Sequence, residues 1–120
     1  MGDGADGELI STTTDGNSFL RALLGNRLPK PAQLAELTKT VPAPIFGENG
    51  RYGLSIAWTP TSCGGAWSHG GTVHGFDTRN GVTEDGTRSV MVSLNTRTPW
   101  HPGDTPKNVG TELVDHALCG

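Results

Sequence analysis

The stretch Arg88-Ser-Val-Met-Val-Ser-Leu-Asn95 alternates large apolar side chains, at Val90, Val92 and Leu94, with polar or differently facing ones. Because successive side chains of a strand point to opposite faces, this period of two predicts a strand with one face against a core. The preceding residues, 84–87, carry the Asp-Gly pair that is typical of a hairpin turn. The sequence therefore predicts that residues 88–95 form the second strand of an antiparallel hairpin.

Two further segments show a strand-like pattern. Residues 71–78 form a weaker strand on the other side of the Asp-Gly turn, and residues 52–58 alternate with Leu54, Ile56 and Trp58 on one face. We therefore expect a sheet of about three antiparallel strands.

Three segments have apolar residues at helical spacing. They are residues 15–24, residues from Pro31 to about Val41, and residues 111–119. The predicted fold is α+β, with helices packed against the antiparallel sheet. We expect one domain over residues 9–120, preceded by a flexible, glycine-rich and acidic segment at residues 1–8.

Composition argues against several functions. The chain has nine Lys and Arg residues and twelve Asp and Glu residues, so it has no excess of positive charge to bind a nucleic acid backbone. No apolar run approaches the roughly 20 residues that span a bilayer, and residues 1–8 lack the basic and apolar regions of a signal peptide. We expect no nucleic acid partner, no membrane span and no signal peptide in this chain.

The two cysteines, Cys63 and Cys119, do not form a C-x-x-C pair, which argues against a metal knuckle or a thioredoxin-type site. They are either two free thiols or one disulfide that ties the C-terminal helix to a loop. A disulfide would stabilise a chain with few apolar residues and would indicate an oxidising compartment outside the cytoplasm.

The segment Ser62-Cys-Gly-Gly-Ala-Trp-Ser-His-Gly-Gly-Thr-Val-His-Gly-Phe76 holds five glycines. Such a run marks either a bulged, bent strand or a place where a ligand comes close. No G-K-[ST] follows it, so we expect no nucleotide and no cofactor. The candidate metal ligands are His69, His74, His101, Asp104 and His116. None of them shares the i, i+4 helical spacing of a zincin histidine pair, so we expect no metal site.

Nucleophilic catalysis is hard to build from these residues alone. Ser68 and His69 are adjacent, so on a strand they point to opposite faces and cannot form a nucleophile–base contact. No G-x-S-x-G elbow occurs in the sequence, and neither cysteine has an activating motif beside it.

Five motifs occur in order along the chain: Gly7-Glu-Leu-Ile-Ser-Thr-Thr-Thr-Asp15, Phe19-Leu-Arg-Ala-Leu-Leu24, Tyr52-Gly-Leu54, Trp67-Ser-His-Gly-Gly-Thr-Val-His-Gly-Phe76 and Arg88-Ser-Val-Met-Val-Ser-Leu-Asn95. Together they resemble the C-terminal part of serine beta-lactamase-like hydrolases, notably actinobacterial D-alanyl-D-alanine carboxypeptidases and class C beta-lactamases. The resemblance covers residues 7–119 and implies a partial beta-lactamase/transpeptidase-like fold.

The resemblance assigns roles to one strand. His69-Gly70-Gly71 matches the family's H-x-G motif, so His69 is expected to set the electrostatics of the site and Gly71 to leave room for substrate. Thr72 would offer its main-chain N–H to the acyl oxyanion. Gly70 stands where Thr or Ser is common, so the hydroxyl that would meet a substrate carboxylate is missing. The resemblance also favours a Cys63–Cys119 disulfide.

The family's S-x-x-K and Y-x-N motifs do not occur in these 120 residues. No lysine lies three residues after a serine, and the only tyrosine, Tyr52, is not followed by x-Asn. Without S-x-x-K and Y-x-N, the chain alone is predicted to be inactive as a serine hydrolase.

Three hypotheses follow. The chain is a C-terminal fragment or split half of such a hydrolase, or a non-catalytic protein that binds a beta-lactam or peptidyl-D-alanine-like ligand, or a remnant without activity. In the family, the strand corresponding to residues 88–95 has a neighbour from the N-terminal part, so here its edge would be open to a homodimer or a partner chain. The suspected disulfide and the resemblance imply an extracellular or periplasm-like location.

Overall fold

The computed structural model describes residues 7–95 and 109–120. Its elements, in chain order, are α1 (Thr13–Leu24), α2 (Pro31–Leu37), β1 (Val41–Pro42), η1 (Pro44–Phe46), β2 (Arg51–Tyr52), β3 (Ala57–Thr61), β4 (Gly64–Ser68), β5 (Gly71–Val73), β6 (Phe76–Thr83), β7 (Ser89–Leu94) and α3 (Val109–Cys119). The expectations for residues 1–6 and for His101 and Asp104 fall outside the described residues.

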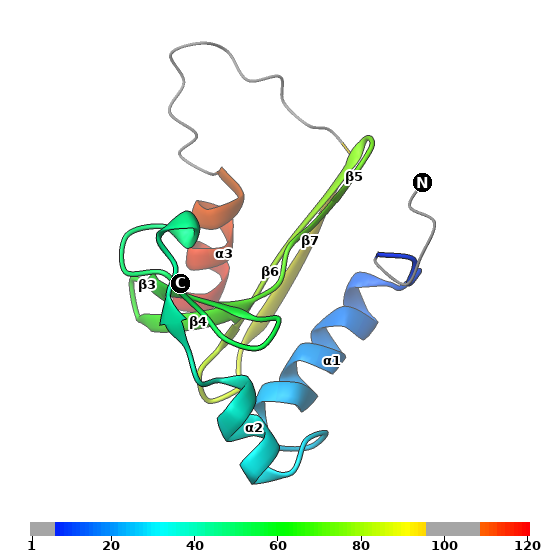
Figure 1. Cartoon of the computed structure of the whole chain (residues 1–120). Helices are drawn as coiled ribbons and strands as arrows, with labels where there is room; N and C mark the ends of the chain where they lie inside the picture. Colours follow the sequence, from blue (N-terminus) through cyan, green and yellow to red (C-terminus); the bar gives the residue numbers. More distant parts are fainter. Residues whose placement is uncertain (1–6, 96–108) are drawn as a thin grey trace.

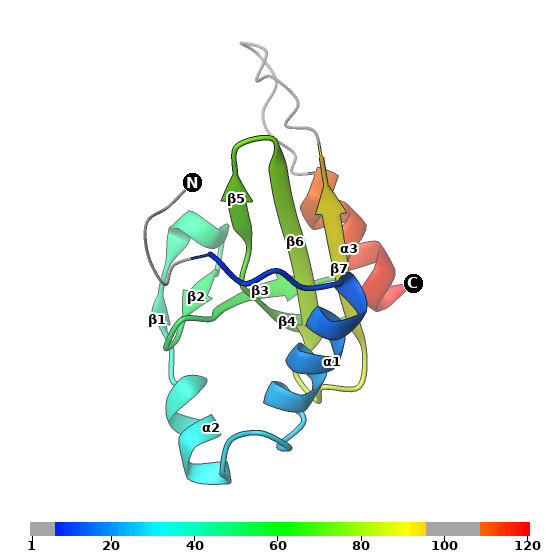
Figure 2. The same ribbon diagram turned by 90° about the vertical axis from the view of Figure 1, so that its right-hand side faces the viewer.

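The strands form one antiparallel sheet around the long strand β6. β4 and then β5 pair with one edge of β6, β7 pairs with the other edge, and β3, β2 and β1 continue the sheet beyond β4. α1 covers one face of β6 and β7, and α3 covers the opposite face (Figures 1 and 2). The predicted α+β class with helices on the sheet is confirmed.

The strand count of about three was wrong, because the described chain has seven strands. The predicted strand 52–58 is broken at residues 53–56, where the Gly53 N–H donates to the Ile56 carbonyl at 2.8 Å and Ser55 has a φ of 61°. The predicted strand 71–78 is likewise broken by a turn at Gly75, whose φ is 80°. Period-two alternation continues through such tight turns, so it overestimated the length of each strand.

The predicted Asp-Gly hairpin between β6 and β7 is confirmed, with Val82 facing Ser89. Asp85 organises the turn: its Oδ1 accepts from the Thr83 hydroxyl at 2.6 Å, the Thr87 hydroxyl at 2.7 Å and the Thr87 N–H at 3.0 Å. These hydrogen bonds stabilise the ionised carboxylate and lower the pKa of Asp85 from 3.8 to about 2.

The Asp85 turn gives a pH prediction. A carboxyl group with a lowered native pKa stabilises the fold above its unfolded pKa, and this contribution is lost as the pH falls through the native value. We expect Asp85→Asn to lower the melting temperature above about pH 4 and the difference to vanish towards about pH 2. Parallel thermal melts across this range check it; a constant difference at all pH values would contradict it.

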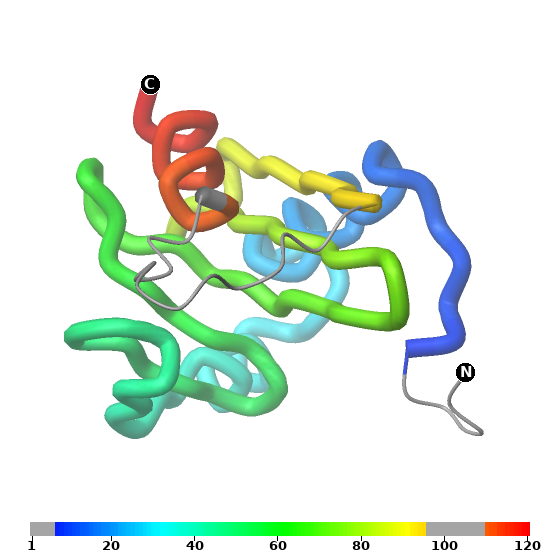
Figure 3. Tube along the Cα trace, turned by 90° about the horizontal axis from the view of Figure 1, so that it is seen from above, coloured from blue at the N-terminus to red at the C-terminus, as the bar shows by residue number. Residues whose placement is uncertain are grey.

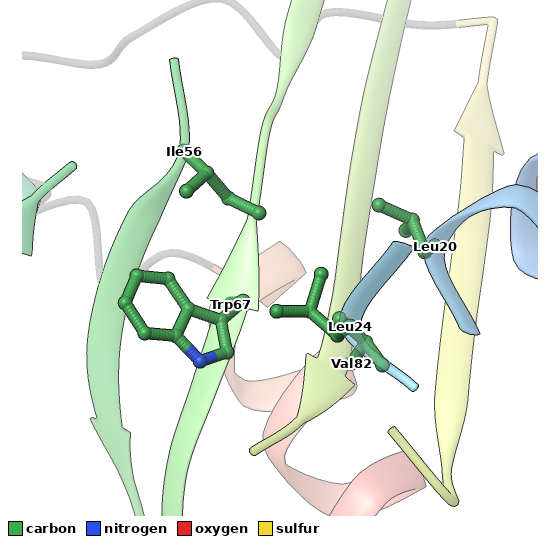
Figure 4. Packing of buried hydrophobic residues seen from close by; sticks show 5 residues of the cluster. All are labelled: Leu20, Leu24, Ile56, Trp67 and Val82. Carbon is green, nitrogen blue, oxygen red and sulfur yellow. The ribbon is translucent and has the colours of Figure 1, made fainter. Parts of the chain in front are cut away.

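The main core lies between α1 and the sheet. Leu20 and Leu24 of α1 pack with Ile56, Trp67 of β4 and Val82 of β6, all at most 7% exposed (Figure 4). This cluster of buried side chains joins α1 to the strands, and the partly buried Leu23 and Met91 pack against it.

α3 packs against the other face through a close approach at Gly81. A Cβ on Gly81 would lie 2.8 Å from Val114 Cγ1 and 2.9 Å from Leu118 Cδ1, and Leu118 is 1% exposed. Because Gly81 has no side chain, α3 can lie directly on β6 at this position.

Candidate functional site

The residues singled out in the sequence, 69–72, lie at an open edge of the sheet. They continue β4 beyond Ser68 and lead into β5. β3 pairs with β4 only as far as the Ala57–Ser68 pair, and no described strand pairs with the outer edge of residues 69–73. All five of these residues are exposed. The predicted site strand is thus accessible along one edge.

The main chain of His69 is held by a side chain of β6. The His69 N–H donates to Asn80 Oδ1 at 3.0 Å, and Asn80 Nδ2 donates to the His69 carbonyl at 2.5 Å. Asn80 is 8% exposed, so its amide is buried while the His69 side chain remains at the surface. The sequence interpretation missed Asn80; the only available signal was a polar amide within an otherwise sheet-forming segment.

Gly71 and Thr72 are also tied to β6. The Thr78 hydroxyl donates to the Gly71 carbonyl at 3.2 Å, and a Cβ on Gly71 would lie 3.0 Å from that hydroxyl. The Thr72 hydroxyl donates to Asp77 Oδ1 at 2.9 Å. The Thr72 hydroxyl is therefore already engaged within the hairpin, which leaves the main-chain N–H as the group expected to act on a substrate.

Asp77 forms an ion pair with Arg79, two residues along β6. It is 8% exposed, and its Oδ2 lies 3.1 Å from the Arg79 guanidinium. A Cβ on Gly110, in the first turn of α3, would lie 2.8 Å from Arg79 Cγ, so α3 begins directly over the arginine stem. The ion pair compensates the charge of the buried carboxylate within β6, and the stem of Arg79 packs against the first turn of α3.

A broad open hollow of about 810 Å³ borders the site. Its lining includes residues of η1, β2, β3, β4, β6 and α3, and the segment after β4 contributes His69 and Gly70. The predicted strand therefore lies at the margin of a concave surface of a size that could receive a small molecule or a polypeptide segment.

The remaining candidates lie apart from His69. His74 is exposed in the β5–β6 turn, and His116 is exposed on α3. Ser93-Leu94-Asn95 has the spacing of Y-x-N with Ser in place of Tyr, but Ser93 belongs to β7, on the opposite edge of β6 from His69. Within residues 7–95 and 109–120, no group of three or more His, Cys, Asp and Glu side chains is arranged to hold a metal.

The C-terminal end of α3 is fastened to the β3–β4 turn, at the end of β4 opposite His69. Cys63, in the β3–β4 turn, forms the predicted disulfide with Cys119. In Figure 3 the red C-terminal end of α3 lies close to this turn. Asp115 accepts from both the N–H and the hydroxyl of Ser62 at 2.7 Å, and these hydrogen bonds lower the pKa of Asp115. α3 is thus attached to the β3–β4 turn by a covalent and a hydrogen-bonded link.

Three features agree with the family resemblance seen in the sequence. They are the H-x-G strand at the sheet edge, the order of the other motifs and the helices on the two faces of the sheet. A family model described as Beta-lactamase matches residues 1–113. The chain belongs to the Beta-lactamase family. It is similar to the crystal structure of a D-stereospecific amidohydrolase from Streptomyces sp., with 39% sequence identity and a TM-score of 0.65. The match covers 71% of this chain and 25% of that one, so this Beta-lactamase family chain spans about a quarter of the relative's length.

Membrane insertion is a separate question. Among the helices described for this Beta-lactamase family chain, none combines the length and the apolar character needed to cross a bilayer.

Proposed function

We propose that this chain supplies the H-x-G side of a serine hydrolase site, whose nucleophile and base come from polypeptide outside these 120 residues. The observation that carries the proposal is the exposed His69-Gly70-Gly71 strand edge, in a Beta-lactamase family chain whose sequence has no S-x-x-K. The chain would be one part of a divided or longer enzyme and inactive alone.

The groups needed for acyl transfer would be divided between this chain and the complementing polypeptide. Acyl transfer needs a serine oxygen that attacks the acyl carbon, a base that takes the serine proton and donors that stabilise the oxyanion. This chain would supply an oxyanion donor from the Thr72 main chain, a polar imidazole at His69, and at Gly71 the space for a substrate beside the strand. None of these groups is a substitute for the activated serine.

The proposed substrate is an amide with a D-configured amino acid component. The support is the similarity to a D-stereospecific amidohydrolase and the family match. Gly70 offers no hydroxyl for a substrate carboxylate, which favours simple amides over carboxylate-bearing beta-lactams and carboxypeptidase substrates.

A partner segment would also complete the sheet. No described strand pairs with the outer edge of β7, whose Val90, Val92 and Leu94 are half-buried. An open apolar edge of this kind pairs readily with another strand, so we propose that the complementing polypeptide, or a second copy, pairs here. The disulfide is compatible with an extracellular location, which we propose for the assembled protein.

The purified chain alone is expected to be inert. With a chromogenic cephalosporin and a D-alanyl-D-alanine peptide, we expect no turnover above the buffer rate and no mass increase from a covalent penicilloyl adduct. Spectrophotometry and intact-protein mass spectrometry check this expectation. An adduct would locate an unrecognised nucleophile in the chain and contradict the proposed division of the site.

A chimera tests the proposed role directly. The matched quarter of the Streptomyces amidohydrolase is replaced by this chain, so that the relative supplies the remainder of its own site. We expect hydrolysis of a D-amino acid amide, and a loss of about tenfold or more in kcat on His69→Ala. The matched control is His116→Ala, on the exposed side of α3. A folded but inactive chimera would contradict the proposed function and leave the ligand-binding hypothesis.

A further inference from the structure

The pairing of β6 with its neighbour is interrupted beside His69. Main-chain pairing of β4 with β6 ends at Trp67–Val82, and pairing of β5 with β6 begins at Gly71–Thr78. Both pairs belong to one continuous register, which places His69 opposite Asn80. No main-chain pair is formed there, because the Asn80 amide occupies the position of the missing ladder bonds.

The two hydrogen bonds of Asn80 use both polar functions of its side chain. The oxygen accepts from the His69 N–H and the nitrogen donates to the His69 carbonyl, so one amide satisfies both main-chain groups that a direct partner would have satisfied. The amide is buried, where an unsatisfied polar group is costly, and this makes the arrangement specific for asparagine.

We propose that Asn80 is a positioning residue, which acts through His69 by holding the H-x-G strand one side-chain width away from β6. The inserted amide displaces His69 and Gly70 outward, towards the open edge of the sheet and the adjoining hollow, and fixes their distance from β6. The functional meaning of this spacing rests on the proposed function, whereas the contacts that create it do not.

Other side chains cannot take over this task. Thr78 and Asp77 hold Gly71 and Thr72 farther along the strand, where main-chain pairing with β6 already exists. Among residues 69–73, His69 is the position where a side chain of β6 takes the place of main-chain pairing. The path of the strand between Ser68 and Gly71 therefore depends on Asn80.

The first test measures amide exchange and chemical shifts in the ¹⁵N-labelled 120-residue protein. We expect Asn80→Ala to shift the amide resonances of His69, Gly70 and Gly71 and to lower the protection of the His69 amide by about tenfold or more. The matched control is Asn17→Ala, which removes a half-buried amide from α1 and is expected to leave these three residues unchanged. Unaltered resonances and protection in Asn80→Ala would overturn the proposal.

Asn80→Asp adds a pH-dependent rescue that a general structural role would not produce. An ionised carboxylate still accepts from the His69 N–H but repels the His69 carbonyl, whereas a protonated carboxyl group can both donate and accept. Burial beside that carbonyl raises the pKa of such a carboxyl group. We expect wild-type resonances and protection factors to return between about pH 7 and about pH 4, with no such recovery in Asn17→Asp. Identical behaviour at all pH values would overturn the assignment of both hydrogen bonds.

The second test places Asn80→Asp in the amidohydrolase chimera. We expect kcat to fall by about tenfold or more with a smaller change in KM, because the displaced strand serves the reacting group rather than ground-state binding alone. Full activity alongside altered His69 resonances would overturn the positioning role. An inactive wild-type chimera would overturn the proposed function only, and the amide data would still decide whether Asn80 holds the strand.

Discussion

Reduction of the Cys63–Cys119 disulfide is expected to lower the free energy of unfolding by about 4 kcal/mol, the chain-entropy value for cysteines 56 residues apart. The effect should be severe because the described core is small and α3 meets the sheet mainly through Val114 and Leu118. Without the cross-link, Ser62 and Asp115 are the remaining polar connection between the β3–β4 turn and the C-terminal end of α3.

The measurement is denaturant unfolding with and without a reductant, accompanied by amide exchange of α3. We expect the amides of α3 to lose protection before those of β4, β6 and β7. A Cys63→Ser, Cys119→Ser double variant is the matched control, since it should show the same loss and no response to the reductant. Equal unfolding midpoints for the oxidised and reduced protein would contradict the prediction.

The accuracy of the sequence interpretation depended on the length of the pattern. β7 and the Asp-Gly turn were predictable because six alternating residues and a strong turn signal agree. β5 and β6 were merged, because alternation does not change when the chain reverses at Gly75. β4 was not predicted, since Gly64 and Gly65 are poor strand formers whose pairing with Thr61 and Pro60 is set by the tertiary fold.

The residues of the site were also predictable only where a local sequence pattern marked them. His69, Gly70, Gly71 and Thr72 were found because they match a motif, and the structure places them together on one exposed edge. Asn80 is eleven residues away, and its role arises only when β6 folds back beside β4. A contact made through a gap in a ladder leaves no local sequence pattern, so no reading of residues 76–83 alone could have revealed it.

Trp67→Ala is expected to lower the free energy of unfolding by about 3–5 kcal/mol, the usual cost of deleting a buried tryptophan side chain. Trp67 is 7% exposed and packs in the same cluster as Leu20, Leu24 and Val82. Truncation would leave a cavity between α1 and the sheet, in a domain whose total stability is of the order of 5–15 kcal/mol. Chemical denaturation monitored by circular dichroism measures the loss.

Two variants make the Trp67 result interpretable. Trp67→Phe retains most of the apolar volume and should cost less than Trp67→Ala, whereas Leu113→Ala, at a position 43% exposed on α3, should change stability by no more than about 0.5 kcal/mol. A loss below about 1 kcal/mol in Trp67→Ala would contradict the assignment of this residue to the core. Because Trp67 precedes His69 by two residues on the same strand, its packing also anchors one end of the segment that Asn80 holds. We therefore expect Trp67→Ala to lower the protection of the His69 amide together with the rest of β4, whereas Asn80→Ala acts on residues 69–71 alone.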